Sequence, residues 1–256
     1  MKRLLMGYLA LIVISISHAQ TFHSIIMVNK TESSARQADR TAEFNNMSAF
    51  LTQIAQSLGY KNHMLQYSGQ SFKASVALQA IELLDVNEND IVVFYYSGHG
   101  ANWDDDEWPH MAFLDRQYSE SRLYNKLKDK CINAKMILCI SACCNMDSEG
   151  NRREKRTYGS FDSEKIKKLF TDFEGHHAFK VSSSIRGEYS LSALGSNGGP
   201  IFSISFREAI RKATTGEIKT SMVYVLEETK RLTMWKARNW FSKAYEQMPQ
   251  FQMERW

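Results

Sequence analysis

Two short apolar segments most constrain how this chain can fold, and each ends in small residues beside a chemically reactive side chain. Residues 91–100 read IVVFYYSGHG, and residues 136–145 read MILCISACCN. Continuous apolar runs of this length, rich in β-branched and aromatic residues, are typical of parallel strands buried on both faces. Ligands and catalytic groups are found at the carboxyl ends of such strands, where His99 and Cys143 stand. We therefore expect an imidazole and a thiol at one edge of a parallel sheet.

The rest of the chain alternates between predicted strands and amphipathic helices. Residues 35–58, for example, carry apolar side chains at helical spacing and end before Gly59. Further strands are expected at 22–28, 61–67, 111–114 and 177–184, and further helices at 72–84, 121–130, 161–173, 202–213 and 221–235. This alternation predicts an α/β fold with a mostly parallel central sheet and helices on both faces.

The amino-terminal segment has the pattern of a secretory signal peptide. Lys2 and Arg3 precede an apolar run over residues 4–16, and the small residues of Ser17-His18-Ala19 follow it. The run is shorter than the ~20 residues that a membrane-spanning helix needs. We expect residues 1–19 to be removed, leaving one domain over residues 20–256. The mature protein is then exported, secreted or periplasmic, and has no membrane contact.

The charge balance argues against a polyanionic partner. The chain has 32 basic and 28 acidic residues and a net charge of +4, and Lys2 and Arg3 belong to the predicted signal. The remaining excess of positive charge is too small to predict binding to nucleic acid or to anionic membranes.

All four cysteines lie between residues 131 and 144, whereas a disulfide framework would join distant loops. Cys139 lies inside an apolar strand, and Cys131 lies on the apolar side of a predicted helix, so both are expected to be buried and inert. The spacing matches no standard zinc pattern, and we expect no metal at these residues.

A cysteine and a histidine held together can form a nucleophile and its base. A free thiol has a pKa near ~8.5 and attacks as the thiolate, so it needs a group such as histidine, with a pKa of ~6.5, to take its proton. The backbone N–H groups of Gly100 and Cys143 are candidate donors to a reacting carbonyl oxygen. His110 is the rival base, and Cys144 is the rival nucleophile.

At this point the ordered motifs resemble those of the caspase and metacaspase peptidases and their legumain, clostripain and gingipain relatives. YSGHG is followed by Cys143, which stands 44 residues after His99. Four more segments extend the resemblance over nearly the whole mature chain: AFLD at 112–115, SSSIRGEYSLS at 182–192, GPIFSISFREAI at 199–210 and QMPQ at 247–250.

The resemblance implies a caspase–hemoglobinase fold with about six central strands, and cleavage of peptide bonds through an acyl-enzyme. It implies that His99 is the general base and acid, that Cys143 is the nucleophile, and that Gly100 and Cys143 donate to the oxyanion. The expected partner is a peptide or protein substrate. The residues that the resemblance places at the substrate are Ser141, Ser182, Ser183 and Ser184.

The residues around Cys143 depart from the patterns of both subfamilies. Metacaspases usually read Asp-x-Cys-His-Ser-Gly, but Ser141, Cys144 and Asn145 stand at three of these positions, and the caspase pattern Gln-Ala-Cys-x-Gly is also missing. A second hypothesis is therefore a non-catalytic domain of this fold that binds peptides or a partner. A third is a cysteine hydrolase or acyltransferase acting on a substrate other than a peptide.

Two charged segments carry secondary hypotheses. The basic residues 152–156 lie in a segment, 147–158, that is either a loop cut during maturation or a solvated charged loop. The acidic residues 104–107 could bind Ca²⁺, attract a basic substrate residue, or form an exposed acidic patch. Their spacing matches no calcium loop, and no cofactor is expected for the reaction itself.

Overall fold

A computed structural model describes residues 19–31, 34–102, 106–143, 160–193, 198–241 and 245–256. Its central sheet follows the order β10-β7-β6-β3-β1-β2, and each neighbouring pair is parallel except β10 with β7. The six strands of this path are β1 (Thr21–Val28), β2 (Lys61–Tyr67), β3 (Ile91–Ala101), β6 (Met136–Cys143), β7 (His177–Ser182) and β10 (Gln250–Arg255). The predicted α/β class and the mostly parallel sheet are confirmed.

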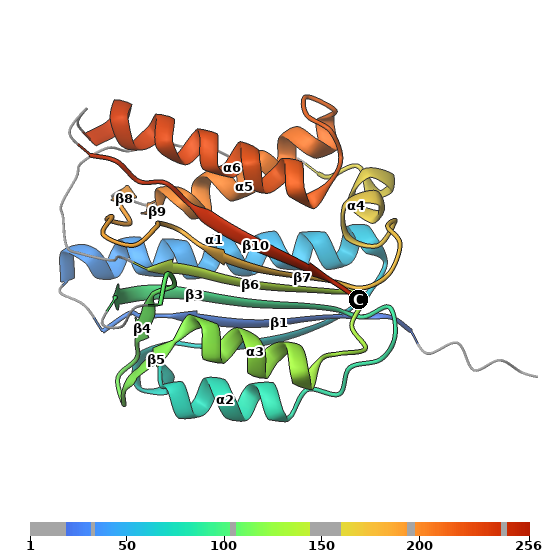
Figure 1. Ribbon diagram of the computed structural model, residues 1–256, viewed down its shortest axis with the longest axis horizontal. Helices are drawn as coiled ribbons and strands as arrows, with labels where there is room; N and C mark the ends of the chain where they lie inside the picture. The colour runs from blue at the N-terminus through green and yellow to red at the C-terminus, as the bar shows by residue number, and fades with distance from the viewer. Residues whose placement is uncertain (1–18, 32–33, 103–105, 144–159, 194–197, 242–244) are drawn as a thin grey trace, which may run out of the picture.

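Helices cover both faces of the sheet, as Figure 1 shows. On one face lie α1 (Ser34–Leu58), α4 (Ser163–Phe170), α5 (Ile201–Thr215) and α6 (Met222–Lys236), and on the other lie α2 (Ala74–Glu82) and α3 (Glu120–Lys130). A 3₁₀ turn, Gly69–Ser71, precedes α2, and a π-helical turn, Ala237–Phe241, follows α6. The sheet is therefore shielded from water on both sides, as a parallel sheet requires.

The two central strands divide their side chains between the two cores. On β3, Ile91, Val93 and Tyr95 pack under α1 and α5, whereas Val92, Phe94 and Tyr96 pack under α2 and α3. On β6, Cys139 and Cys143 belong to the α2/α3 core. Fully burying one large apolar side chain contributes roughly 1.5–3 kcal/mol, so this alternation is a main source of stability.

Short strand pairs were not resolved by the sequence pattern. β4 (His110–Ala112) pairs with the end of β3 and with β5 (Gln117–Ser119), and β8 (Ser192–Ala193) pairs with β9 (Gly199–Pro200). The pattern placed an extended segment at 111–114, a loop at 190–200 and no strand at the carboxyl terminus.

The predicted signal, apart from its last residue, lies outside the described residues. Over the described part of the chain, no helix is long and apolar enough to cross a membrane.

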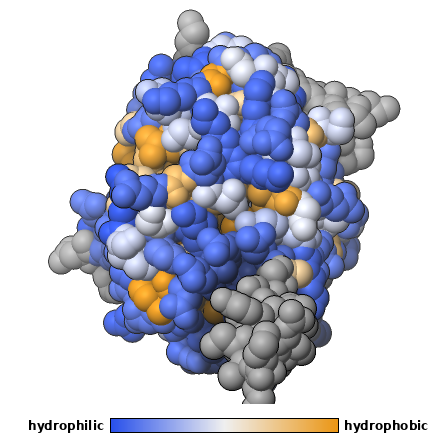
Figure 2. Space-filling model, turned by 90° about the vertical axis from the view of Figure 1, so that its right-hand side faces the viewer, coloured by the Kyte–Doolittle hydropathy of each residue, from blue (hydrophilic) through white to orange (hydrophobic). Residues whose placement is uncertain are grey.

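Figure 2 shows the end of the molecule from which the parallel strands start. Its surface is mostly hydrophilic, and hydrophobic residues gather there only in small separate groups. Small scattered apolar groups are ordinary on a folded protein, so this end does not stand out as a binding surface.

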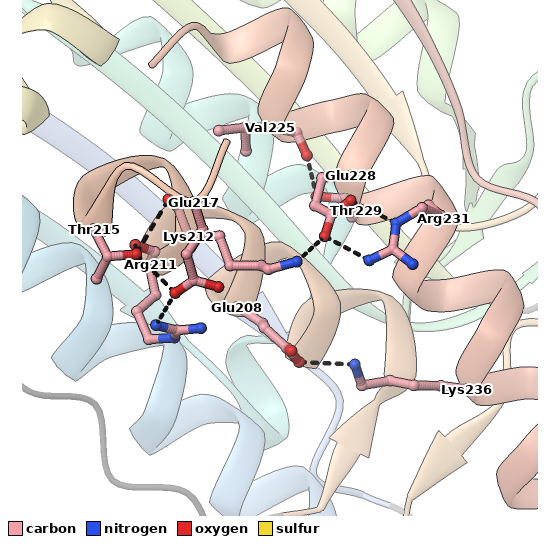
Figure 3. Close-up of polar contacts among 10 residues, drawn as sticks. All are labelled: Glu208, Arg211, Lys212, Thr215, Glu217, Val225, Glu228, Thr229, Arg231 and Lys236. Carbon is pink, nitrogen blue, oxygen red and sulfur yellow. Dashed lines mark hydrogen bonds and ion pairs between the residues drawn. The ribbon is translucent and has the colours of Figure 1, made fainter. Parts of the chain in front are cut away.

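An ion-pair network joins α5 to α6 (Figure 3). Lys236 lies 2.8 Å from Glu208, and these two side chains are only 1% and 11% exposed. Glu228 of α6 pairs with Lys212 of α5 and also accepts from Arg231 at 2.6 and 2.7 Å. Because the Lys236–Glu208 pair is almost dry, each charge depends on the other for its stability.

A half-buried histidine, a buried histidine and a buried aspartate form a hydrogen-bonded chain at the amino ends of β1, β2 and β3. His23 Nδ1 lies 2.9 Å from His63 Nδ1, and His23 Nε2 lies 3.3 Å from Asp90 Oδ2. Asp90 also accepts from the backbone of Thr21 at 2.6 Å. Burial lowers the pKa of His23, although Asp90 opposes the shift. Two protons cannot both lie between the facing Nδ1 atoms. One of the two Nδ1 atoms must therefore be unprotonated and accept the hydrogen bond.

We expect Lys236→Met to cost about 3 kcal/mol of unfolding free energy, because it removes the buried ammonium group that pairs with the Glu208 carboxylate. Replacing Glu208 by Gln in the same variant should recover much of the loss. The control is Arg238→Met, since Arg238 and Glu246 are 51% and 66% exposed, and its cost should stay below about 1 kcal/mol. Urea unfolding measures all three, and equal costs for the two single variants would contradict the argument.

We also expect acid to weaken the fold through His23. Its pKa is lower in the folded state than the unfolded value, so the unfolded chain binds more protons as the pH falls through ~6.5. The stability that this group contributes is therefore complete above that pH and is lost progressively as the pH falls below it. His23→Gln should reduce this pH dependence in thermal or urea unfolding. An unchanged pH dependence in His23→Gln would contradict this prediction.

Candidate active site

The two predicted strand ends lie side by side. β3 and β6 pair from Ile91 with Met136 to Gly98 with Cys143. His99 is the next residue of β3, so the backbone that carries it adjoins the last residue of β6. The predicted meeting of these two strand ends is thus present in the fold, while the chemical roles of His99 and Cys143 stay predictions.

Cys143 is the last residue of β6 and is only 1% exposed. Its carbonyl oxygen accepts a hydrogen bond from Ser183 Oγ at 3.0 Å. The backbone N–H of Ser183 donates to Ser141 O at 2.9 Å. Ser183 therefore continues the β6–β7 pairing past the end of the ladder. Its two hydrogen bonds hold the backbone carbonyls of Ser141 and Cys143, one on either side of the residue between them.

The backbone of His99 is held from the α2/α3 face of the sheet. The Tyr96 hydroxyl lies 2.6 Å from His99 O and 2.9 Å from Ala112 O, and His99 pairs with Ala112 across β3 and β4. Tyr96 in turn packs against Phe72 and Phe113, with ring centroids 5.4 and 4.9 Å apart. A buried phenol thus ties the candidate histidine to its neighbouring strand.

Gly98 makes this arrangement of Tyr96 sterically allowed. A Cβ at position 98 would lie 2.7 Å from the Tyr96 hydroxyl oxygen and 2.9 Å from the Phe72 ring. These distances are too short for unshifted atoms. The glycine before His99 is therefore required by packing, independently of any role in binding substrate.

Ser141 contacts a buried acid that the sequence pattern did not single out. Its hydroxyl donates to Glu120 Oε2 at 2.7 Å, and Glu120 Oε1 has no hydrogen-bond partner among the described residues. Burial raises the pKa of Glu120 well above its usual value, with Lys180 acting in the opposite direction. Lys180 lies over the Trp108 ring at 4.1 Å, and burial lowers its pKa. The Ser141 hydroxyl is thus already hydrogen-bonded within the protein, in a buried cluster of polar side chains beside β6.

The serines that the resemblance assigns to the substrate are fully buried. Ser182 Oγ donates to Ser184 O at 3.1 Å, and Ser183 Oγ donates to Cys143 O as described above. Ser184 Oγ has no hydrogen-bond partner among the described residues. The Ser182 and Ser183 hydroxyls therefore bond to backbone at the end of β7, and contact with a substrate stays a prediction for all three.

The other candidates fall in different places. Gly100 pairs with Met111, and His110 pairs with Ala101, two residues beyond His99. Cys144, residues 147–158 and two of the four acids at 104–107 lie outside the described residues. Asp106 accepts from Trp108 N at 3.2 Å, and the described residues hold no group of three metal-ligating side chains.

Cys131 and Cys139 are both buried. Burial raises the pKa of Cys131 to about 12 and that of Cys139 well above its usual value. Both thiols therefore stay protonated at neutral pH, which agrees with the expectation that they are inert.

Comparison with known proteins supports the resemblance. A family model described as the caspase domain matches residues 25–255. No curated protein matches the chain. Among solved structures, the crystal structure of a protein from Geobacter sulfurreducens is similar, with a TM-score of 0.53 and 13% identity over 93% of this chain and 94% of that chain. At this identity the similarity concerns the fold alone.

We expect Gly98→Ala to cost about 1–3 kcal/mol, because the added methyl group must displace both the Tyr96 hydroxyl and the Phe72 ring. In a Tyr96→Phe background the same substitution should cost less, by at least about 0.5 kcal/mol, because the nearest atom has been removed. Urea unfolding of the four proteins in this cycle gives the coupling. Independent effects would show that the hydroxyl does not occupy the space beside Gly98.

Proposed function

This chain belongs to the caspase-domain family of peptidases, and we propose that it is a cysteine endopeptidase with Cys143 as nucleophile and His99 as general base and acid. The observation that carries the proposal is the β3–β6 register, which pairs Gly98 with Cys143 and so brings the backbone of His99 beside that of the cysteine. A peptidase-type function follows from the family. The dyad and the acyl-enzyme are our assignment.

In the proposed reaction His99 takes the proton of Cys143, and the sulfur forms a bond to the carbonyl carbon of the substrate. The C=O electron pair moves to oxygen, where the N–H groups of Gly100 and Cys143 stabilise the charge by roughly 2.7–4 kcal/mol each. His99 then protonates the leaving amine as the C–N bond breaks. Water, deprotonated by His99, hydrolyses the thioester and regenerates the thiol. Apart from that water, these steps use only groups of the protein and the substrate, and assays with and without calcium test the expectation that no metal is needed.

A non-catalytic domain that binds peptides or a partner is the second candidate. The burial of Cys143, at 1% exposed, favours it, since a substrate carbonyl needs access to the sulfur. Ser141, which stands where metacaspases carry an acid, is bonded to Glu120. Under the peptidase proposal, a local movement of the chain must expose the thiol before peptide is cleaved.

We further propose that the protein is exported and acts on peptides or proteins outside the cytoplasm. The basic start and short apolar run of residues 1–19 support export. Amino-terminal sequencing of the protein from culture tests the proposed start at Gln20.

The decisive test is labelling with a peptide that carries a thiol-reactive group, using a mixed library because the preferred residue is unknown. We expect labelling of the parent protein, none in Cys143→Ala, and a decrease of about 10²–10⁴-fold in His99→Ala. Cys144→Ala and His110→Ala are the matched controls and should be labelled normally. Labelling that follows Cys144, or no labelling and no peptide cleavage with or without calcium, would reject the assignment. Turnover of esters alone would indicate the non-peptide alternative.

A further inference from the structure

Gln247, in the segment between α6 and β10, joins three parts of the chain near the candidate nucleophile. Its side-chain Nε2 donates to Ser183 O at 2.9 Å, and its Oε1 accepts from Leu191 N at 2.8 Å. The residue is only 1% exposed. One carboxamide therefore links the end of β7, the segment that leads into β8, and the segment before the last strand.

The contacts of Gln247 continue directly to Cys143. Ser183, whose carbonyl oxygen accepts from Gln247, donates its hydroxyl to Cys143 O at 3.0 Å and its N–H to Ser141 O at 2.9 Å. The backbone N–H, the backbone carbonyl and the hydroxyl of Ser183 are thus all bonded. A change at Gln247 reaches the backbone of the nucleophile through a single intervening residue.

The neighbours of Gln247 hold it in place for this contact. Met248 N donates to Glu188 Oε2 at 2.6 Å, and Ile185 N donates to Met248 O at 2.9 Å. The amide orientation also has one solution, because Leu191 N can only donate and Ser183 O can only accept. Gln247 is therefore preorganised as a donor toward the β7 end and as an acceptor toward Leu191.

We propose that Gln247 is a positioning residue of the cysteine peptidase site, acting through Ser183 to hold the backbone of Cys143. This inference rests on the proposed function for its catalytic consequence, but its contacts can be tested without turnover. It adds a residue from the carboxyl-terminal segment to a site whose proposed reacting groups lie on β3 and β6. Catalytic geometry is sensitive to small displacements, so loosening this link should slow the chemical step more than it weakens substrate binding.

Glutamate at position 247 provides a sharp test, because it has the same shape and can donate only when protonated. Burial raises the pKa of a carboxyl group. In Gln247→Glu, a protonated acid can keep both hydrogen bonds, whereas a carboxylate faces Ser183 O with no proton to donate. We expect the kcat of Gln247→Glu to be near that of the parent protein at about pH 5. At about pH 8 it should be about one tenth of the parent value or smaller, with little change in KM.

Two further variants complete the design. Gln247→Met has similar length and neither hydrogen bond, so it should be slow at both pH values. Gln252→Glu is the matched control, because Gln252 is exposed on β10, and its ratio to the parent protein should not vary with pH. If Gln247→Met fails to fold, Ser183→Ala takes its place and should lower kcat in the same way.

Hydrogen exchange followed by mass spectrometry separates this inference from the proposed function. In Gln247→Glu, the Ser183 amide should exchange about tenfold faster than in the parent protein at about pH 8, and at the parent rate at about pH 5. The Leu191 amide can still donate to the carboxylate and should keep its protection at both pH values. A parent protein without peptidase activity rejects the proposed function, and this exchange result still decides whether Gln247 holds the β6–β7 ends. Parent-like exchange and parent-like kcat in Gln247→Glu at the higher pH would overturn the inference.

Discussion

The parallel pairing of β3 with β6 is the constraint on which the rest of this structure depends. Its ladder runs from Ile91 with Met136 to Gly98 with Cys143. Both strands are buried on both faces, so a shift of one residue would exchange the side chains of the two cores. The register is therefore strongly specified, and it determines which residues meet at the carboxyl ends. The helices on the two faces exclude water from the ladder, and each outer strand extends it.

Buried polar groups are arranged around this ladder and connect it to the helices. Tyr95 of β3 donates to Glu43 of α1 and lies 2.7 Å from Ser203 of α5, and Arg207 lies 3.3 Å from Glu43. Burial raises the pKa of Tyr95 well above its usual value, so the phenol stays protonated and able to donate. On the opposite face Ser141 donates to Glu120. Such groups cost free energy to bury, and their hydrogen bonds restrict the helices to one arrangement.

The candidate site illustrates which residues local sequence can identify. His99 and Cys143 stand out because each ends a continuous apolar run, which is a property of a few neighbouring residues. Glu120 looks like an ordinary acid in the first turn of α3, and its contact with Ser141 joins residues far apart in the chain. Gln247 belongs to a segment that resembles a family motif, but only the fold places its amide against Ser183. These partners depend on packing between distant segments, which single-residue patterns do not encode.

By itself the sequence determined the α/β class, the buried strands and most of the helices, because the spacing of apolar residues reflects local backbone geometry. It located β2 at its observed bounds and placed α1 within one residue. Only the tertiary structure decided the strand order, the antiparallel direction of β10 and the hairpin beside His99. Strand neighbours are selected by how whole faces pack, and short strands such as β4 and β8 carry too few residues for a periodic signal. For the same reason, the buried surroundings of Cys143 became visible only once distant segments were brought together.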